Sequence, residues 1–74
     1  GYDLQMTIAQ LLAFVSIARE QNLTRAAESL HLSQSAISSQ IKGLEEELGV
    51  SLFERNSRGM ALSPSGQTLL SYAK

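Results

Sequence analysis

Residues 26–49 of this chain read AAESLHLSQSAISSQIKGLEEELG, and their spacing decides the fold. Two helices that cross at a tight turn need small residues where they approach most closely, and Ala26 and Ala27 supply them. Leu32 follows at a spacing that would plug the turn from below, and Ile37 at one that would anchor the second helix. The stretch therefore predicts two helices joined by a three- to four-residue turn, although an ordinary helical hairpin with an alanine contact has the same pattern.

The second of these helices, expected over residues 34–48, has two contrasting faces. One stripe is apolar and predicts a packed face, with Ile37, Ile41, Leu44 and Leu48. The opposite stripe is wholly polar, with Ser35, Ser38, Ser39 and Lys42. Ser33 is placed to cap the start, and Gly49 to end the helix in the left-handed conformation. One face is therefore expected to pack and the other to stay free for a partner.

Upstream, residues 7–20 carry the pattern of an amphipathic helix. Thr7 and Gln10 have the spacing of a capping box. Apolar residues recur with the helical period at Ile8, Leu11, Leu12, Val15 and Ala18. Phe14 and Ile17 widen the stripe, so this helix is expected to be buried on more than one side. Asn22 is expected to stop this helix as a left-handed residue, and Thr24 to cap the short helix that follows.

Downstream of Gly49 the helical period ends. Residues 50–55 are typical of a strand, 56–59 of a turn and 60–62 of a returning strand. Ser63 and Pro64 then open a fourth helix that continues to the end of the sequence. The predicted fold class is mainly α, a winged helix-turn-helix with a three-helix core, a two-stranded β wing and a C-terminal linker helix.

Three segments follow from this pattern. Residues 1–6 have no periodicity and are expected to be a disordered arm or a cloning remnant. Residues 7–62 are expected to form the winged helix-turn-helix domain. Residues 63–74 are expected to be the start of a truncated linker helix.

Composition excludes several classes of function. The chain has no cysteine and one histidine, so neither a disulfide framework nor a site with two imidazoles is possible, and no metal or cofactor is expected. No apolar run approaches the roughly 20 residues that span a bilayer, so a cytoplasmic protein without a membrane partner is expected. A nucleophilic serine needs a base held by a third group, and no carboxylate is spaced to orient His31, so no catalytic residue is expected.

Together these residues resemble a known family. The run AAESLHLSQSAISSQIKGLEEELGVSLFER, followed by SRG and LSPSG, is similar to the N-terminal DNA-binding domain of the LysR-type transcriptional regulators, over residues 6–73. The resemblance implies a bacterial transcription factor that binds double-stranded DNA at an inverted repeat. It also implies a homodimer through the linker helix, a higher oligomer of the full-length protein, and a separate C-terminal domain that takes a small-molecule effector.

The resemblance also implies which residues contact DNA. The recognition helix 34–48 would enter the major groove, where Gln34 can pair with adenine through its amide. Base readout is expected from Gln34, Ser35, Ser38 and Ser39, backbone contacts from Thr24, Arg25, Ser33 and Lys42, and wing contacts over 55–59 from Arg55 and Arg58. Many members carry proline where this chain has Ser35 and a basic residue where it has Ser39, so base preference there stays open.

The charge balance is unusual for a DNA-binding protein, because the formal net charge is −1. Glu45, Glu46 and Glu47 lie about 15–20 Å along the helix from Gln34. They are therefore interpreted as a solvated face that points away from DNA, opposite the cations. A protein-binding module is the main alternative to DNA binding, but it would place an apolar or aromatic anchor on the face that here carries Gln, Ser and Lys.

Overall fold

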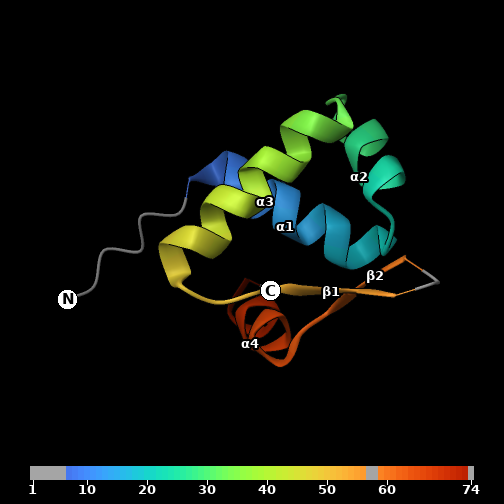
Figure 1. The fold of residues 1–74 in the computed structure, drawn as a ribbon. Helices are drawn as coiled ribbons and strands as arrows, with labels where there is room; N and C mark the ends of the chain where they lie inside the picture. The colour runs from blue at the N-terminus through green and yellow to red at the C-terminus, as the bar shows by residue number, and fades with distance from the viewer. Residues whose placement is uncertain (1–6, 57–58, 74) are drawn as a thin grey trace.

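The structure is a computed structural model that describes residues 7–56 and 59–73. The elements there are, in order, α1 (Ile8–Glu20), α2 (Leu23–Ser29), α3 (Gln34–Leu48), β1 (Phe53–Asn56), β2 (Gly59–Leu62) and α4 (Pro64–Ala73). Figure 1 shows α1, α2 and α3 grouped together, with the hairpin along one side of them and α4 against the hairpin and α1. This arrangement confirms the predicted winged helix-turn-helix fold. The expected arm 1–6 and Arg58 lie outside the described residues.

The core lies where the three N-terminal helices meet the start of β1. Its buried residues are Ala13, Phe14, Ile17, Ala26, Ala27, Ile37, Ile41, Leu44, Leu52 and Phe53. The rings of Phe14 and Phe53 have centroids 5.5 Å apart and therefore join α1 to β1. As predicted, Ala26 and Ala27 are buried at the helix crossing, where α1 also contributes Ser16, whose Oγ lies 2.8 Å from the Oγ of Ser29.

The packed face of α1 differs from the prediction. Ile8 and Leu12 were expected on the inward stripe, but they are 77% and 51% exposed, whereas Phe14 and Ile17 are fully buried. Because α1 is apolar around much of its circumference, its sequence period does not specify which side meets α2 and α3. In the folded domain, the side of α1 that carries Phe14 is the one that packs against the other elements.

Capping residues fix the helix ends, and most were predicted correctly. Thr7 and Gln10 form the capping box, Ser33 Oγ accepts from the N–H of Ala36 at 3.1 Å, and Gly49 ends α3 with φ 71°. The prediction for the α1–α2 junction was wrong. Gln21 takes the left-handed conformation, with φ 55°, and leaves Asn22 extended as the cap of α2.

The turn between α2 and α3 is closed by backbone hydrogen bonds. Leu32 N–H donates to the carbonyl of Ala27 at 2.8 Å, and His31 N–H donates to that of Glu28 at 3.1 Å. This is the Schellman pattern, and it places His31 in the left-handed region with φ 57°. Leu32 was expected to plug the turn from below, but its side chain is 42% exposed. The backbone of Leu32, rather than its side chain, therefore closes the turn.

The hairpin is antiparallel, with Phe53 opposite Leu62 and Asn56 opposite Gly59. Its first strand begins at Phe53 rather than at residue 50, because the N–H of Leu52 is engaged outside the hairpin. Leu52 N–H donates to the Glu45 carboxylate at 2.7 Å, and its carbonyl accepts from Ser63 N–H at 2.9 Å. Residues 50–52 therefore form a connector that ties β1 to two helices.

The first turn of α4 is packed against that connector. Ser63 Oγ donates to the carbonyl of Ser51 at 2.6 Å and accepts from Gly66 N–H at 3.0 Å, which confirms Ser63 as the cap. A Cβ at Gly66 would lie well inside van der Waals contact with the Leu52 carbonyl oxygen. Glycine is therefore required for α4 to approach this closely. No helix in the described ranges is long and apolar enough to cross a membrane.

Candidate nucleic-acid interface

The predicted reading face of α3 stands outward. Gln34, Ser35, Ser39 and Lys42 are exposed, and Ser38 is half-buried. On the opposite side Ile37 and Leu44 are completely buried. The residues expected to contact bases and phosphates are therefore held on a helix whose other face is fixed in the core, which is the arrangement that a rigid reading surface needs.

Gln34 makes a specific contact with the preceding helix. Its Nε2 donates to Oγ1 of Thr24 at 2.7 Å. Thr24 is the second residue of α2 and is not its cap, because Oδ1 of Asn22 accepts from Arg25 N–H at 2.9 Å. The side chain of Arg25 is exposed, but its backbone N–H is already satisfied within the protein.

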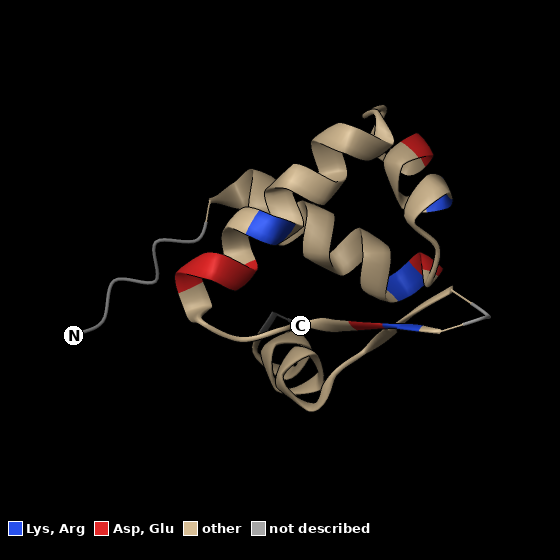
Figure 2. Cartoon of the chain, viewed as in Figure 1, with Lys and Arg blue, Asp and Glu red and all other residues tan. Residues whose placement is uncertain are grey.

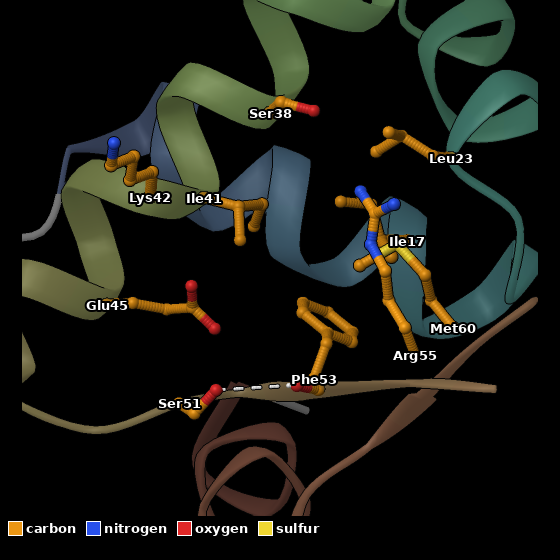
Figure 3. Close-up of a pocket in the computed structure, with 10 residues that line it drawn as sticks. All are labelled: Ile17, Leu23, Ser38, Ile41, Lys42, Glu45, Ser51, Phe53, Arg55 and Met60. Atoms are coloured by element: carbon orange, nitrogen blue, oxygen red, sulfur yellow. Dashed lines mark hydrogen bonds between the residues drawn. The ribbon is translucent and has the colours of Figure 1, made fainter.

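A cleft of about 310 Å³ lies between α3 and the hairpin. Figure 3 shows apolar side chains at its base and polar side chains around it. Arg55 extends from β1 toward the side of the cleft that Ser38 and Leu23 line, whereas Lys42 turns away from β1. The lining consists of Ile17, Leu23, Ser38, Ile41, Lys42, Glu45, Ser51, Phe53, Arg55 and Met60.

A second cleft adjoins the first, and the two share Leu23, Arg55 and Met60. It lies at the N-terminal ends of α2 and α3 and is lined by Asn22, Leu23, Thr24, Gln34, Arg55, Asn56, Gly59 and Met60. We call the two clefts together the interhelix–wing groove. Of the predicted contact residues, Thr24, Gln34, Ser38, Lys42 and Arg55 line this groove. Arg25, Ser33, Ser35 and Ser39 do not line it, and Arg58 is not described.

The wing is fixed to the helices at one backbone contact. Met60 N–H donates to the carbonyl of Gln21 at 3.2 Å. Gly59 has φ 130°, and a Cβ there would overlap the same carbonyl oxygen. Glycine is thus needed at residue 59 for both conformation and approach, and this contact sets where Arg55 stands relative to α2.

Glu45 was interpreted as part of a solvated face, and for this residue the interpretation was wrong. It is half-buried, lines the cleft beside Lys42 and Arg55, and accepts from Leu52 N–H at 2.7 Å. Its carbonyl also accepts from Gly49 and Val50 N–H. No motif within α3 marks Glu45 for this contact, because Leu52 N–H reaches the carboxylate only after the connector folds back along the helix.

Glu46 and Glu47 do remain exposed at the C-terminal end of α3. Figure 2 shows acidic residues at this end of α3 and lysine nearer its middle, whereas α1, α2 and β1 each carry both acidic and basic residues. The expected separation of charge is therefore seen along α3 for Glu46 and Glu47, but it does not extend to the other helices or the hairpin. Glu45 lines the same cleft as Lys42 and Arg55, which were expected to stand on the opposite side.

Comparison with known proteins identifies the family to which this domain belongs. The family model described as bacterial regulatory helix-turn-helix protein, lysR family, matches residues 8–67. The chain is 42% identical over 71 residues to the RuBisCO operon transcriptional regulator of Allochromatium vinosum and 49% identical over 70 residues to the regulator BsdA of Bacillus subtilis. These alignments cover 96% and 93% of the chain but only 24% of each relative. The chain thus spans about a quarter of their length.

Solved structures agree with the sequence match. The BenM DNA-binding domain in complex with catB site 1 DNA superposes with a TM-score of 0.87 at 43% identity, covering 92% of this chain and 76% of that one. The CbnR DNA-binding domain in complex with DNA gives 0.86 at 41% identity, covering 92% and 78%. Because the matched family consists of regulatory helix-turn-helix proteins, the match excludes an enzyme as the alternative. The chain belongs to the lysR family of bacterial regulatory helix-turn-helix proteins and is its DNA-binding domain.

Proposed function

We propose that this domain reads a specific double-stranded DNA sequence with the N-terminal half of α3 in the major groove. The observation that carries the proposal is the outward polar face of α3 beside a groove that Arg55 borders. A recognition helix contacts base edges chiefly through its N-terminal residues, and Gln34 is the first residue of α3. The DNA in the BenM and CbnR complexes supports this choice of partner.

Individual roles follow from side-chain chemistry. Gln34 would pair with adenine, and the hydroxyls of Ser35, Ser38 and Ser39 would contact base edges or nearby phosphates. Thr24, Arg25 and Lys42 would contact phosphates, as would Ser33, whose hydroxyl proton is not used by its cap. Arg55, and Arg58 beyond the described residues, would contact the backbone or the minor groove beside the wing over residues 55–59.

Selection of bound duplexes from a random pool tests the reading role of α3. Gln34→Ala should lose preference at one base pair per half-site, by about 5- to 100-fold, because a good bidentate pair contributes about 1–3 kcal/mol of discrimination. Gln67→Ala is the matched control, since Gln67 is an exposed glutamine on α4. Unchanged base preference in Gln34→Ala would remove Gln34 from this role.

Salt dependence separates DNA binding from the protein-binding alternative. Phosphate contacts release counterions, so affinity for a duplex should fall steeply as salt rises. The isolated domain is expected to bind in the micromolar range or more weakly as a monomer, because the chain's formal net charge is −1. Duplex affinity that does not change with salt would contradict the proposal, and submicromolar affinity of a proven monomer at physiological salt would contradict the expected weakness.

We further propose that α1 and α4 present a surface to a second copy of the chain. Ile8 and Leu12 are exposed on α1, Tyr72 is 83% exposed on α4, and the two helices contact each other. A two-fold dimer would set two recognition helices on successive major-groove faces, and its operator would be an inverted repeat. Sedimentation tests this, with Leu12→Glu expected to weaken association. A clean monomer that still prefers a palindrome over a half-site would contradict it.

The full-length protein would extend beyond this domain. The relatives are about four times as long as the part that aligns, which supports a C-terminal effector domain and higher oligomers in a cytoplasmic regulator. The linker helix would then begin at residue 63 and continue past residue 74, with residues 7–62 as the reading unit. Limited proteolysis of the full-length protein, expected to cut beyond residue 74, tests these boundaries.

A further inference from the structure

We infer that Thr24 is a positioning residue that orients the Gln34 amide for base recognition, and so helps to set which base this domain prefers. The inference rests on the proposed reading role of Gln34 and adds a second residue to it. The observation is the 2.7 Å hydrogen bond from Gln34 Nε2 to Thr24 Oγ1, which joins the first turns of α2 and α3.

Both backbones that carry this bond are fixed independently of it. Asn22 caps α2 and Ser33 caps α3, each through a hydrogen bond from its side chain. Ala26 of α2 and Ile37 of α3 are buried in the same core, each four residues after the cap of its helix. Because neither helix end can move freely, the position of Thr24 Oγ1 defines where the Gln34 amide sits.

The direction of the bond also decides which atoms remain for a base. A primary amide has two N–H groups and one carbonyl oxygen. Since Nε2 uses one N–H for Thr24, its second N–H and Oε1 stay available, and adenine recognition needs that pair, one donor to N7 and one acceptor for N6. In the structure the threonine oxygen accepts this bond, which holds the amide with one N–H group and Oε1 unused.

Orientation before binding matters because a glutamine side chain loses rotamer freedom when it is immobilised at an interface. A Gln34 amide that Thr24 already holds has less freedom left to lose than one that moves freely in solvent. This smaller loss of side-chain freedom favours binding at the base pair that Gln34 reads, and it leaves contacts elsewhere on the duplex unchanged. Thr24 would therefore affect discrimination at one position more than overall affinity.

A phosphate contact by Thr24 is the competing role, and its consequences differ. The hydroxyl keeps its own proton for a phosphate oxygen while it accepts from Gln34. Loss of a phosphate contact weakens binding nearly equally for all sequences and reduces the salt slope. Loss of a positioning contact changes the preference among bases. The two roles are thus distinguished by specificity rather than by affinity.

The test compares Thr24→Val, which removes the hydroxyl at nearly constant shape, with Thr24→Ser, which keeps it. The probe is a set of four duplexes that differ only at the base pair whose preference Gln34→Ala abolishes. Thr68→Val is the matched control, an exposed threonine on α4. Circular dichroism melts of each variant check that the fold is retained.

Thr24→Val should reduce discrimination at that base pair by about 2- to 10-fold, with Thr24→Ser near the parent value. In the Gln34→Ala background, Thr24→Val should have no further effect on discrimination. Equal loss of affinity for all four duplexes with intact preference would overturn the inference and leave the reading role of Gln34 standing. If Gln34→Ala itself leaves every preference unchanged, the proposed reading role fails and the inference fails with it.

Discussion

The two halves of α3 perform different tasks although they belong to one continuous helix. In the N-terminal half, polar side chains from Gln34 to Lys42 face outward, and only Gln34 has a described side-chain partner among them. In the C-terminal half, Glu45 accepts from three N–H groups of the outgoing chain and Gly49 turns it toward the wing. The first half is thus free to meet a partner, and the second half fixes the position of the hairpin.

The largest expected effect is a loss of stability on substitution of Leu44, the apolar residue that anchors the C-terminal half of α3. Leu44 is fully buried, so Leu44→Ala should destabilise the domain by about 2–5 kcal/mol through lost burial and a cavity. Glu47→Ala, on the exposed side of the same turn, should change stability by less than about 0.5 kcal/mol. Urea unfolding followed by circular dichroism measures both, and similar midpoints would refute the assignment of faces.

The next largest effect tests whether Glu45 holds the wing. Glu45→Ala leaves the buried N–H of Leu52 without its acceptor, and the expected loss of stability is about 1–3 kcal/mol. Glu45→Gln keeps an oxygen acceptor and should lose less. Glu46→Ala is the matched control, because Glu46 is an exposed neighbour. Equal unfolding midpoints for Glu45→Ala and Glu46→Ala would mean that the carboxylate contributes nothing to the junction.

A substitution in the first half should change binding without changing stability. Ser39→Arg adds a cation to the exposed face that is proposed to meet DNA, so affinity for duplex DNA should rise and the salt slope should steepen by about 1. Fluorescence anisotropy at several salt concentrations measures the slope, with Thr68→Arg on α4 as the control. If the slope of Ser39→Arg equals that of the control, this part of α3 does not lie near DNA.

The smallest effect concerns the turn that leads into the first half. His31 occupies a left-handed position that glycine usually takes, so His31→Gly should stabilise the domain by about 0.5–1 kcal/mol. Gly49→Ala at the other end of α3 should destabilise it by a similar amount, since Gly49 has φ 71°. Thermal melts measure both changes. A destabilised His31→Gly would show that the imidazole makes a contact that outweighs the backbone strain.

Local signals were sufficient wherever a residue acts within its own helix. The capping box at Thr7, the cap at Ser33 and the ending glycine Gly49 were all predicted, because each contact spans three or four residues. The prediction for the α1–α2 junction was wrong although it also concerned neighbouring residues, because Asn22 is suited to either a left-handed stop or an N-cap. Gln21 took the strained position and left Asn22 to cap the next helix.

By itself, the sequence determined the order of helices and hairpin, the tight crossing at Ala26 and Ala27, and the outward polar face of α3. These depend on periodicity and residue size, which are properties of the chain alone. Tertiary structure decided which side of α1 is buried, where β1 begins, the role of Glu45 and the bond between Thr24 and Gln34. Each of these depends on two segments that meet only after folding, so no pattern within either segment could specify it.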